Sequence, residues 1–449
     1  MLKYLVLALV SVSAFAKAPT NLPKSFTVDG QKVVFVDFNK AQYDITYDIS
    51  GKAASFVATM EFQTFEKGFP IFDLVDAPAS VELNAVAVEN KVITTPKKDT
   101  TLRMAVQELA AGKHKLVIKG ALKTLVKFED SGVKSAFWVS DLSERSYIEK
   151  YLPTNMEYDQ YKMNFHIEFK GGSAKQAVYT NGVVKQNGNI VDIDYPDYYN
   201  CSSIFFHTTP TTSVEETRFS YKSKDGRDLP VVIYQSKSTW SAQSTLEKFK
   251  AETIAVLAEL EGDYGPFPHP DLTIYNAGSG GMEYQGATMT EFSALGHEMT
   301  HSYFARGVMP ANGNSGWMDE AIASWRDNNY PTQSTMYGSS RMSNRGDYIR
   351  TTDTQAYSFG ARFMSYLDGR FKAQGGLKVY LRHMVEQKLF QPLSIDEYIA
   401  EMVSVYNDQE VKALYKQYTY GSTSRFFGAQ EMNHSVHRKM TTEQLQNHL

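Results

Sequence analysis

His297 and His301 are separated by three residues in the segment His297-Glu298-Met299-Thr300-His301. On a helix, residues four apart lie on the same face, so both imidazoles reach one metal ion. Glu298 follows the first His, so its side chain points toward a metal-bound water molecule rather than toward the metal. Its carboxylate can take a proton from that water molecule. Two imidazoles and a carboxylate bind zinc and leave one coordination position open for water or substrate. The motif predicts a hydrolytic zinc centre, and it requires a third ligand elsewhere in the chain.

Glu320 is the predicted third ligand, nineteen positions after His301 in the helix-like segment 317–325. Between the two helical segments the chain is broken by four turn-forming residues, Gly307, Pro310, Gly313 and Gly316. These breaks allow the two helices to pack antiparallel with Glu320 facing the His pair. The sequence predicts one Zn²⁺ per chain, with Glu298 activating water.

These residues resemble the aminopeptidase N family of gluzincin zinc metallopeptidases, in which the same motif is followed by Glu after eighteen intervening residues. The segment Gly280-Gly281-Met282-Glu283-Tyr284 is similar to the Gly-x-Met-Glu-Asn segment of that family. In the family this strand runs along the substrate, and its Glu binds the free α-amino group. The resemblance therefore implies substrate binding by Gly280, Gly281, Met282 and Glu283. Tyr284 departs from the family's Asn.

The resemblance implies roles for two more residues. Tyr357 begins the segment 357–361, which is similar to the family's Tyr-x-x-Gly-Ala and is expected to supply the Tyr that stabilises the transition-state oxyanion. Tyr348 is the competing candidate for this role. Glu144, nine residues before Pro153, is the candidate for a second amine-binding carboxylate in the N-terminal domain.

Strand-like segments dominate the chain before residue 210. In 161–169, Met163, Phe165, Ile167 and Phe169 alternate with polar residues, which predicts a strand with one buried face. Segments 42–47 and 55–62 are further strand candidates. Later segments have helical periodicity, and helices are expected at 241–260, 292–306, 318–328, 357–371, 377–390 and 395–406.

The predicted fold is α+β and multidomain: an N-terminal antiparallel β-domain, either a sandwich or a saddle, followed by a thermolysin-like α/β zinc-peptidase domain. Residues 1–16 read as a secretory signal peptide, with Lys3, an apolar run and a small-x-small cleavage site. We expect the β-domain at 17–212, the catalytic domain at 213–421 and a polar tail at 422–449. The family's C-terminal helical domain is expected to be missing.

The amino-acid composition indicates which classes of binding partner to expect. The chain has 46 basic and 50 acidic side chains and a net charge of -4, with no basic stretch that would follow a phosphate backbone, so nucleic acid is not expected. The apolar run of the signal peptide is too short to span a bilayer, and no integral membrane segment is expected after its removal. We expect an exported protein, periplasmic or secreted, that acts on peptides or proteins. The sequence does not specify an oligomeric state.

The function predicted is zinc-dependent removal of N-terminal residues from peptides. Two alternatives keep the metal and change the substrate: a zinc endopeptidase, and a glycyl-aminopeptidase-like enzyme with an open groove. A catalytically inactive peptide-binding protein is the alternative of another class. The last is disfavoured because the three ligands and the general base are all present.

Overall fold

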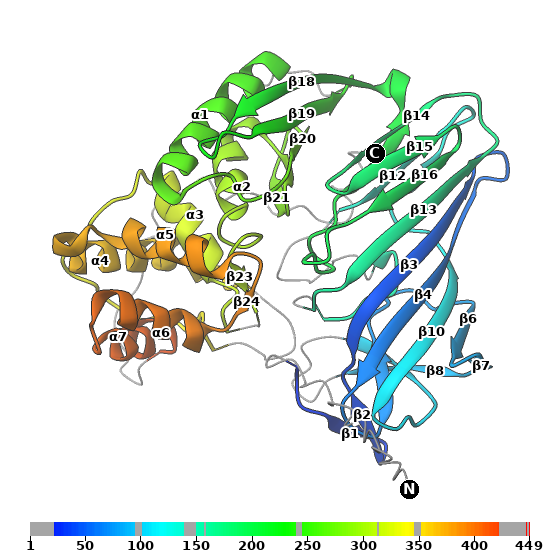
Figure 1. Cartoon of the computed structure of the whole chain (residues 1–449), viewed down its shortest axis with the longest axis horizontal. Coiled ribbons are helices and arrows are strands. Elements are labelled where there is room, and N and C mark those ends of the chain that lie inside the picture. Colours follow the sequence, from blue (N-terminus) through cyan, green and yellow to red (C-terminus); the bar gives the residue numbers. More distant parts are fainter. Residues whose placement is uncertain are drawn as a thin grey trace, which may run out of the picture.

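The computed structural model describes residues 22–94, 101–138, 150–156, 159–238, 245–311, 314–344 and 352–421, with Gln446 and Leu449. The chain forms a β-rich half and a half in which helices pack on a smaller sheet (Figure 1). The predicted α+β class with an N-terminal β-domain is confirmed. The predicted signal peptide, Glu144, Tyr348 and nearly all of the tail lie outside the described residues.

The β-domain contains seventeen strands among the described residues. Their bounds are β1 Phe26–Val28, β2 Gln31–Val34, β3 Asp37–Asp48, β4 Ala53–Thr64, β5 Phe69–Phe72, β6 Ser80–Leu83, β7 Val86–Ala87, β8 Asn90–Thr94, β9 Thr101–Ala105, β10 Gly112–Ala121, β11 Val126–Phe128, β12 Val133–Phe137, β13 Lys162–Lys170, β14 Gln176–Thr180, β15 Val183–Asn187, β16 Ile190–Asp194 and β17 Phe206–Pro210.

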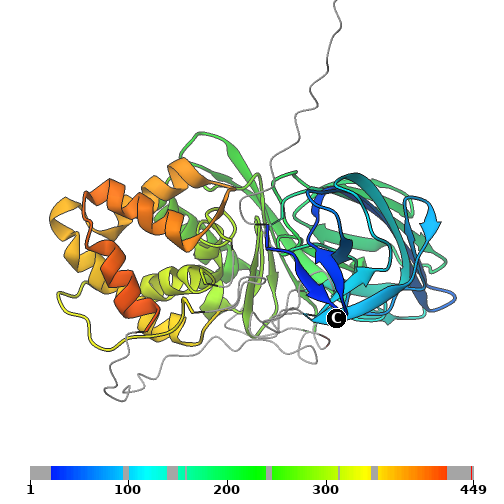
Figure 2. The same ribbon diagram turned by 90° about the horizontal axis from the view of Figure 1, so that it is seen from below.

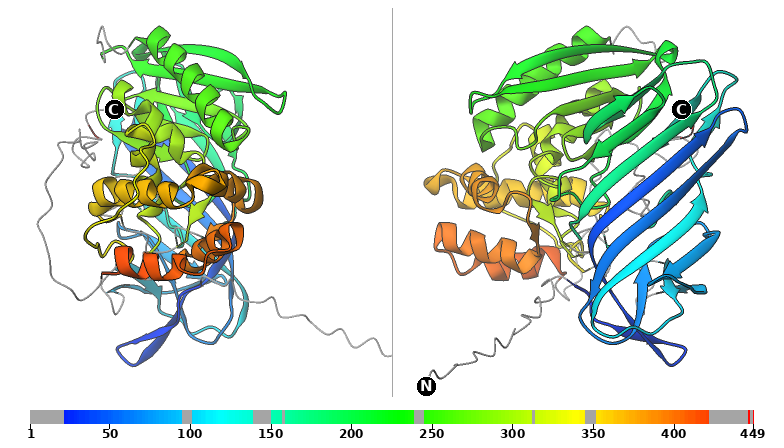
Figure 3. Two further views of the ribbon diagram at one scale, coloured as in Figure 1. Left: turned by 90° about the vertical axis from the view of Figure 1, so that its left-hand side faces the viewer. Right: turned by 45° about the vertical axis from the view of Figure 1, so that its right-hand side comes forward.

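These strands form three sheets. The largest has the order β15-β16-β13-β3-β4-β10-β6-β7, and its long strands run obliquely across the domain (Figure 3). The others have the orders β1-β2-β5-β9-β8 and β11-β12-β17-β14. The expected alternation in β13 is confirmed, because Met163, Phe165, Ile167 and Phe169 are all buried. One correction concerns direction: β13 pairs with β3 in parallel, so the large sheet is mixed rather than purely antiparallel.

The second half builds a five-stranded sheet of order β18-β19-β20-β22-β21, covered by helices (Figure 2). Its strands are β18 Val214–Lys222, β19 Asp228–Ser236, β20 Leu272–Asn276, β21 Gly281–Tyr284 and β22 Ala287–Thr290, and a small sheet pairs β23 Met309–Pro310 with β24 Pro392–Leu393. The helices are α1 Leu246–Tyr264, α2 Leu295–His301, α3 Met318–Asp327, α4 Ala361–Arg370, α5 Leu377–Lys388, α6 Ile395–Tyr406 and α7 Val411–Thr419, with short helical turns η2 Thr211–Ser213, η3 Phe292–Ala294, η4 Ala356–Gly360 and η5 Lys372–Gln374.

Two expected helices are shorter or less regular than predicted. The expected helix 292–306 is the turn η3 followed by α2, which ends at His301. After it the chain folds back so tightly at Gly307 that a Cβ there would lie 2.7 Å from the carbonyl oxygen of Tyr303. The expected helix 357–371 begins instead with the π-helical turn η4, and α4 continues from Ala361.

One hydrophobic cluster extends across both halves, and the helical half has a second cluster of its own. Trp138 of the β-domain stacks on Tyr275 of β20, with ring centroids 5.4 Å apart. Tyr179 of β14 stacks on Tyr234 of β19 at 3.6 Å. Such packed aromatic contacts hold the two domains in a fixed relation. None of the helices within the described residues is long and apolar enough to span a membrane.

Close helix contacts depend on glycine where the chain approaches the predicted site. A Cβ at Gly360 in η4 would lie 2.7 Å from the Cβ of Ala321 in α3. A Cβ at Gly296 in α2 would lie 2.0 Å from Nη1 of Arg326 in α3. Both distances are shorter than van der Waals contact. At Gly360 the neighbour is the short side chain of Ala321, so only glycine lets η4 pack this closely against α3, whereas at Gly296 the Arg326 side chain could move aside.

We predict that Gly360→Ala destabilises the protein by about 1–3 kcal/mol, because the added methyl group collides with Ala321. The free energy of unfolding, measured by denaturant titration, checks this. Gly262→Ala in α1 is the matched control, since its Cβ would meet only Nζ of Lys224 at 3.7 Å. In a helix this control is expected to be neutral or to stabilise by about 0.5–1 kcal/mol. Equal effects of the two substitutions would contradict the packing argument.

Candidate metal centre and active site

The helices α2 and α3 bring the three predicted ligands together. All seven residues of α2 are buried, and His297 and His301 lie one turn apart with ring centroids 4.8 Å from each other. Glu320 lies in the first turn of α3 and is also buried. One ligand atom from each of the three residues lies within 4.8 Å of the others. The fold therefore places two imidazoles and one carboxylate around a common point.

The distances in this cluster fit a zinc ion. Oε2 of Glu320 lies 3.0 Å from Nε2 of His297 and 3.4 Å from Nε2 of His301. Ligand atoms about 2.0–2.2 Å from a tetrahedral ion lie roughly 3.3 Å from each other. Imidazole nitrogen and carboxylate oxygen are also ligand types that zinc prefers. The donor set and its spacing thus suit zinc.

Electrostatics in the cluster favour a bound cation. Burial opposes charge on His297, but hydrogen bonds to Asp327 and Glu320 raise its pKa well above the usual value. Burial also opposes charge on His301, whose pKa is raised to about 9 by the negative charges of Glu320 and Glu283. Burial opposes ionisation of Glu320, yet the imidazoles hold its pKa well below the usual range. The buried carboxylates therefore stabilise positive charge at this point, which is the charge that a divalent cation would bring.

A second carboxylate orients the first ligand. Nδ1 of His297 lies 2.6 Å from Oδ2 of Asp327. This contact directs Nε2 toward the metal position and increases the basicity of the ring. Nη1 of Arg326 lies 3.5 Å from Oδ1 of Asp327, and Arg326 in turn pairs with Glu259 of α1. Asp327 was not among the residues predicted from the sequence, although it lies two helical turns after Glu320 and therefore on the same face of α3.

Glu298 lies against the strand β21. A Cβ at Gly281 would be 2.0 Å from Oε1 of Glu298, so the carboxyl group occupies the space that a side chain at position 281 would fill. Burial raises the pKa of Glu298 to about 8, while the charges of His297 and His301 act in the opposite direction. A group with a pKa near neutrality is suited to accept and return a proton.

The strand β21 carries the segment predicted to bind substrate. It is an edge strand of the five-stranded sheet, antiparallel to β22. Gly280 precedes it with φ of +67°, and Met282 is buried. Glu283 is buried as well, and a ligand atom of its carboxylate lies within 4.8 Å of ligand atoms of Glu298 and His301. The predicted amine ligand thus lies beside the predicted general base.

Glu283 has a partner that the sequence analysis did not foresee. Its Oε1 lies 3.0 Å from Nη2 of Arg306, and the exposed fractions of the two side chains are 3% and 1%. Arg306 comes five residues after His301, in the turn that follows α2. The carboxylate is therefore part of a buried ion pair.

Tyr357 reaches the same cluster from η4. Its hydroxyl donates to Oε1 of Glu320 at 2.8 Å, and its ring lies nearly parallel to that of His297 at 6.4 Å. The structure thus brings Tyr357 to the metal position, while Tyr348 and Glu144 lie outside the described residues. The chemical roles of all these residues stay predictions.

Comparison with known proteins yields similarity of structure alone. No protein-family model and no curated protein sequence matches the chain. The chain is similar to a mutant of the M1 zinc metallopeptidase from Deinococcus radiodurans bound to a Tyr-Ser-Ala substrate, with 14% identity, a TM-score of 0.63 and coverage of 87% of this chain and 95% of that one. It is also similar to leukotriene A4 hydrolase from Saccharomyces cerevisiae, with 11% identity, a TM-score of 0.64 and coverage of 88% and 69%. These similarities show that the chain has the fold of these proteins.

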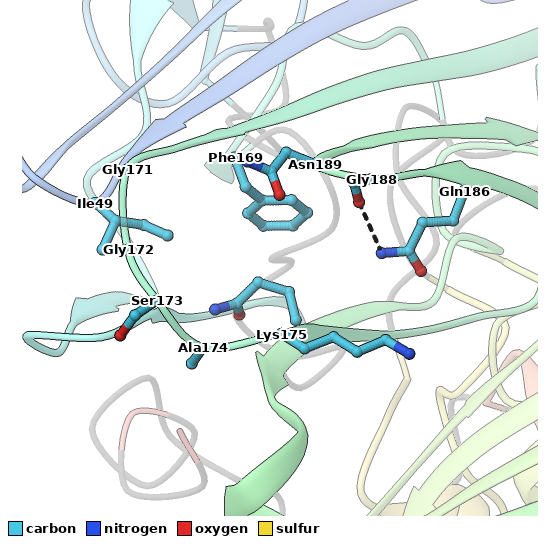
Figure 4. Close-up of a pocket in the computed structure, with 11 residues that line it drawn as sticks. Ile49, Phe169, Gly171, Gly172, Ser173, Ala174, Lys175, Gln186, Gly188 and Asn189 are labelled. Atoms are coloured by element: carbon cyan, nitrogen blue, oxygen red, sulfur yellow. Dashed lines mark hydrogen bonds between the residues drawn. The ribbon is translucent and has the colours of Figure 1, made fainter.

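A separate hollow of about 520 Å³ lies in the β-domain (Figure 4). Residues following β13 and the β15–β16 turn line it, together with the buried side chains of Ile49 and Phe169. None of the predicted site residues is among its lining residues. The candidate metal centre is therefore distinct from this hollow.

We predict that Asp327→Asn weakens zinc binding by about 10–100-fold, because His297 loses the carboxylate that fixes its ring. Competition with a chromophoric chelator measures the dissociation constant. Asp396→Asn, an exposed residue of α6, is the control and is expected to leave zinc affinity unchanged. If Asp327→Asn bound zinc as tightly as the unaltered protein, Asp327 would not be needed to orient His297.

Proposed function

We propose that the protein is a zinc-dependent aminopeptidase that removes N-terminal residues from peptides. The observation that carries this proposal is the convergence of His297, His301 and Glu320 around one point beside the buried carboxyl group of Glu298, with Oε2 of Glu320 3.0 and 3.4 Å from the two Nε2 atoms. The similarity in fold to M1 zinc metallopeptidases supports a peptidase. Zinc bound at the three ligands would polarise the scissile carbonyl and lower the pKa of a water molecule.

Each of the other side chains has a separate role in the proposed reaction. Glu298 accepts the proton of the attacking water and returns it to the departing amine. Tyr357 donates its hydroxyl hydrogen to the oxygen of the substrate carbonyl as negative charge develops there. The edge strand β21 aligns the substrate, and Glu283 binds its terminal ammonium. An ammonium fixed at Glu283 places the first peptide bond next to Glu298.

A zinc endopeptidase is a second candidate, and one observation favours it. Glu283 already has a counter-charge in Arg306, so its attraction for an ammonium is weaker than that of an isolated carboxylate. A substrate would then gain less from a free amine, and internal peptide bonds would compete better. The dependence of cleavage on a free N-terminal amine therefore distinguishes an aminopeptidase from an endopeptidase.

We predict that Glu298→Gln binds one equivalent of zinc and loses about 10²–10⁴-fold in kcat, because glutamine cannot accept the proton of water. Metal analysis and steady-state kinetics with an aminoacyl substrate check both parts. Glu252→Gln on the exposed face of α1 is the matched control. Undiminished turnover by Glu298→Gln would exclude the mechanism.

We predict that a peptide with a free N-terminus is cleaved with kcat/KM roughly 10–100-fold above that of the same peptide N-acetylated, which corresponds to one hydrogen bond to a charged group. Product analysis by mass spectrometry identifies the bond that is cut. Equal cleavage of both peptides at an internal bond would favour the endopeptidase. Stoichiometric zinc without hydrolysis of either would support an inactive peptide-binding protein.

A further inference from the structure

Two hairpin turns, one from each half of the chain, meet at the end of β21. In the second half, Gln285 and Gly286 form the two-residue turn between β21 and β22. In the β-domain, Asn181 lies in the turn between β14 and β15 and is 2% exposed. Nδ2 of Asn181 donates to the backbone oxygen of Gln285 at 2.7 Å. The strand predicted to carry the substrate is therefore attached to the β-domain at its end.

The side chain of Asn181 suits this contact because an amide has two N–H donors and one acceptor. Its second N–H is donated to the backbone oxygen of Ser203 at 2.6 Å, and its Oδ1 accepts from the backbone N–H of Phe205 at 2.9 Å. The hydroxyl of Tyr199 lies 3.0 Å from the same oxygen of Gln285 and 3.2 Å from the backbone oxygen of Asn181, so it shares one proton between them. The β-domain thus supplies two donors to the carbonyl of Gln285.

The turn between β21 and β22 is also fixed on its other side. Gly286 has φ of +70°, a conformation that favours glycine, and a Cβ there would lie 2.9 Å from the backbone oxygen of Asp271. The backbone oxygen of Gly286 accepts a hydrogen bond from the N–H of Thr273 in β20 at 2.9 Å. The turn therefore has little room to change its conformation independently of β20.

The strand β21 is in contact with α2 and the turn after it at both of its ends. At its start, the carboxyl group of Glu298 fills the space beside Gly281. At its end, Nε2 of Gln285 donates to the backbone oxygen of Arg306, five residues after His301, at 2.9 Å. Because β21 has only four residues, a displacement of its turn shifts the whole strand relative to α2. Hydrogen bonds between main chains vary in length by only about half an ångström, so such a shift would disturb pairing with a peptide.

We propose that Asn181 and Tyr199 are positioning residues for the substrate: by binding the backbone oxygen of Gln285, they hold β21 at the distance from α2 at which a peptide paired with β21 reaches the predicted zinc ligands. This inference rests on the proposed alignment of the substrate by β21. An extended peptide that joins an edge strand gains affinity from main-chain hydrogen bonds, which weaken when the strand is displaced. The β-domain then contributes to peptide binding through residues that act on β21.

A positioning role and a purely structural role predict different results. If the contacts only stabilise the fold, their loss lowers the temperature of unfolding and leaves the ligand affinity of the folded protein unchanged. If they position β21, a ligand that extends along the strand is weakened, whereas a ligand that contacts only the metal is not. Comparison of a long with a short zinc-binding ligand therefore separates the two roles.

The test uses two ligands that bind zinc through the same hydroxamate: acetohydroxamate, and malonyl hydroxamate joined to a Leu-Ala amide. The ratio of their dissociation constants, measured by calorimetry on the zinc-loaded protein, reports the contribution of the peptide without any turnover. In the unaltered protein we expect the peptide to strengthen binding roughly 10–100-fold through main-chain hydrogen bonds. Neither ligand has a free amine, so the result is independent of how the substrate N-terminus is recognised.

Asn181→Asp keeps the shape of the side chain but removes both N–H donors, and it should reduce the ratio by about tenfold. Tyr199→Phe removes the shared donor and should reduce the ratio by about twofold to fivefold. The affinity for acetohydroxamate and the zinc content should stay unchanged in both variants. Tyr47→Phe is the matched control: this buried hydroxyl donates to Oγ of Ser135 at 2.9 Å within the β-domain, and its loss should leave the ratio unchanged.

Thermal unfolding shows whether each variant is folded. Should Asn181→Asp fail to fold, Tyr199→Phe decides the question, because it removes a single hydroxyl and keeps the buried ring. Unchanged ratios in the folded variants would overturn this inference and leave the aminopeptidase proposal standing. A ratio of one in the unaltered protein would overturn the inference together with the alignment of substrate by β21, and absence of zinc binding would overturn the proposed function as well.

Discussion

Acidic side chains from α2, α3 and β21 are buried close together, and this burial constrains how the site can be built. Four acidic side chains there are buried: Glu283, Glu298, Asp319 and Glu320. An isolated ionised carboxylate in such a place is strongly unfavourable. Each of these groups needs either a proton, as the raised pKa of Glu298 indicates, or a nearby positive charge. The paired imidazoles supply it when protonated, and a divalent cation supplies it more effectively because one ion contacts several ligands at once. The same requirement explains why a guanidinium is buried beside Glu283.

The scaffold meets this constraint by close approach of its elements. Gly281 leaves room for the carboxyl group of Glu298, and Gly296 leaves room for the guanidinium of Arg326. Each glycine removes a side chain where two groups must meet within a few ångströms. The aromatic core shared by β14, β19 and β20 then keeps the β-domain from shifting relative to α2 and α3. When the side chains of a site are already held in place, binding a ligand costs little conformational entropy.

The β-domain has a part in the site as well as in stability. Ser202 binds Arg306, and Asn181 binds the backbone of Gln285 next to β21. The strand expected to carry the substrate, β21, is therefore held from one side by the five-stranded sheet and from the other by the β-domain. Arg306 connects these contacts because a guanidinium has donors at two ends, which lysine does not have.

Features that depend on local spacing could be predicted from the residues alone. Residues four apart on a helix share a face, so His297 and His301 had to converge, and alternation in 161–169 had to bury one face of β13. The early end of α2 and the pairing of Glu283 with Arg306 were decided only by tertiary structure. Both depend on contacts between residues distant along the chain, about which periodicity contains no information. Asp327 stands between these cases, because helical spacing placed it on the face of Glu320, but only packing brought it within 2.6 Å of His297.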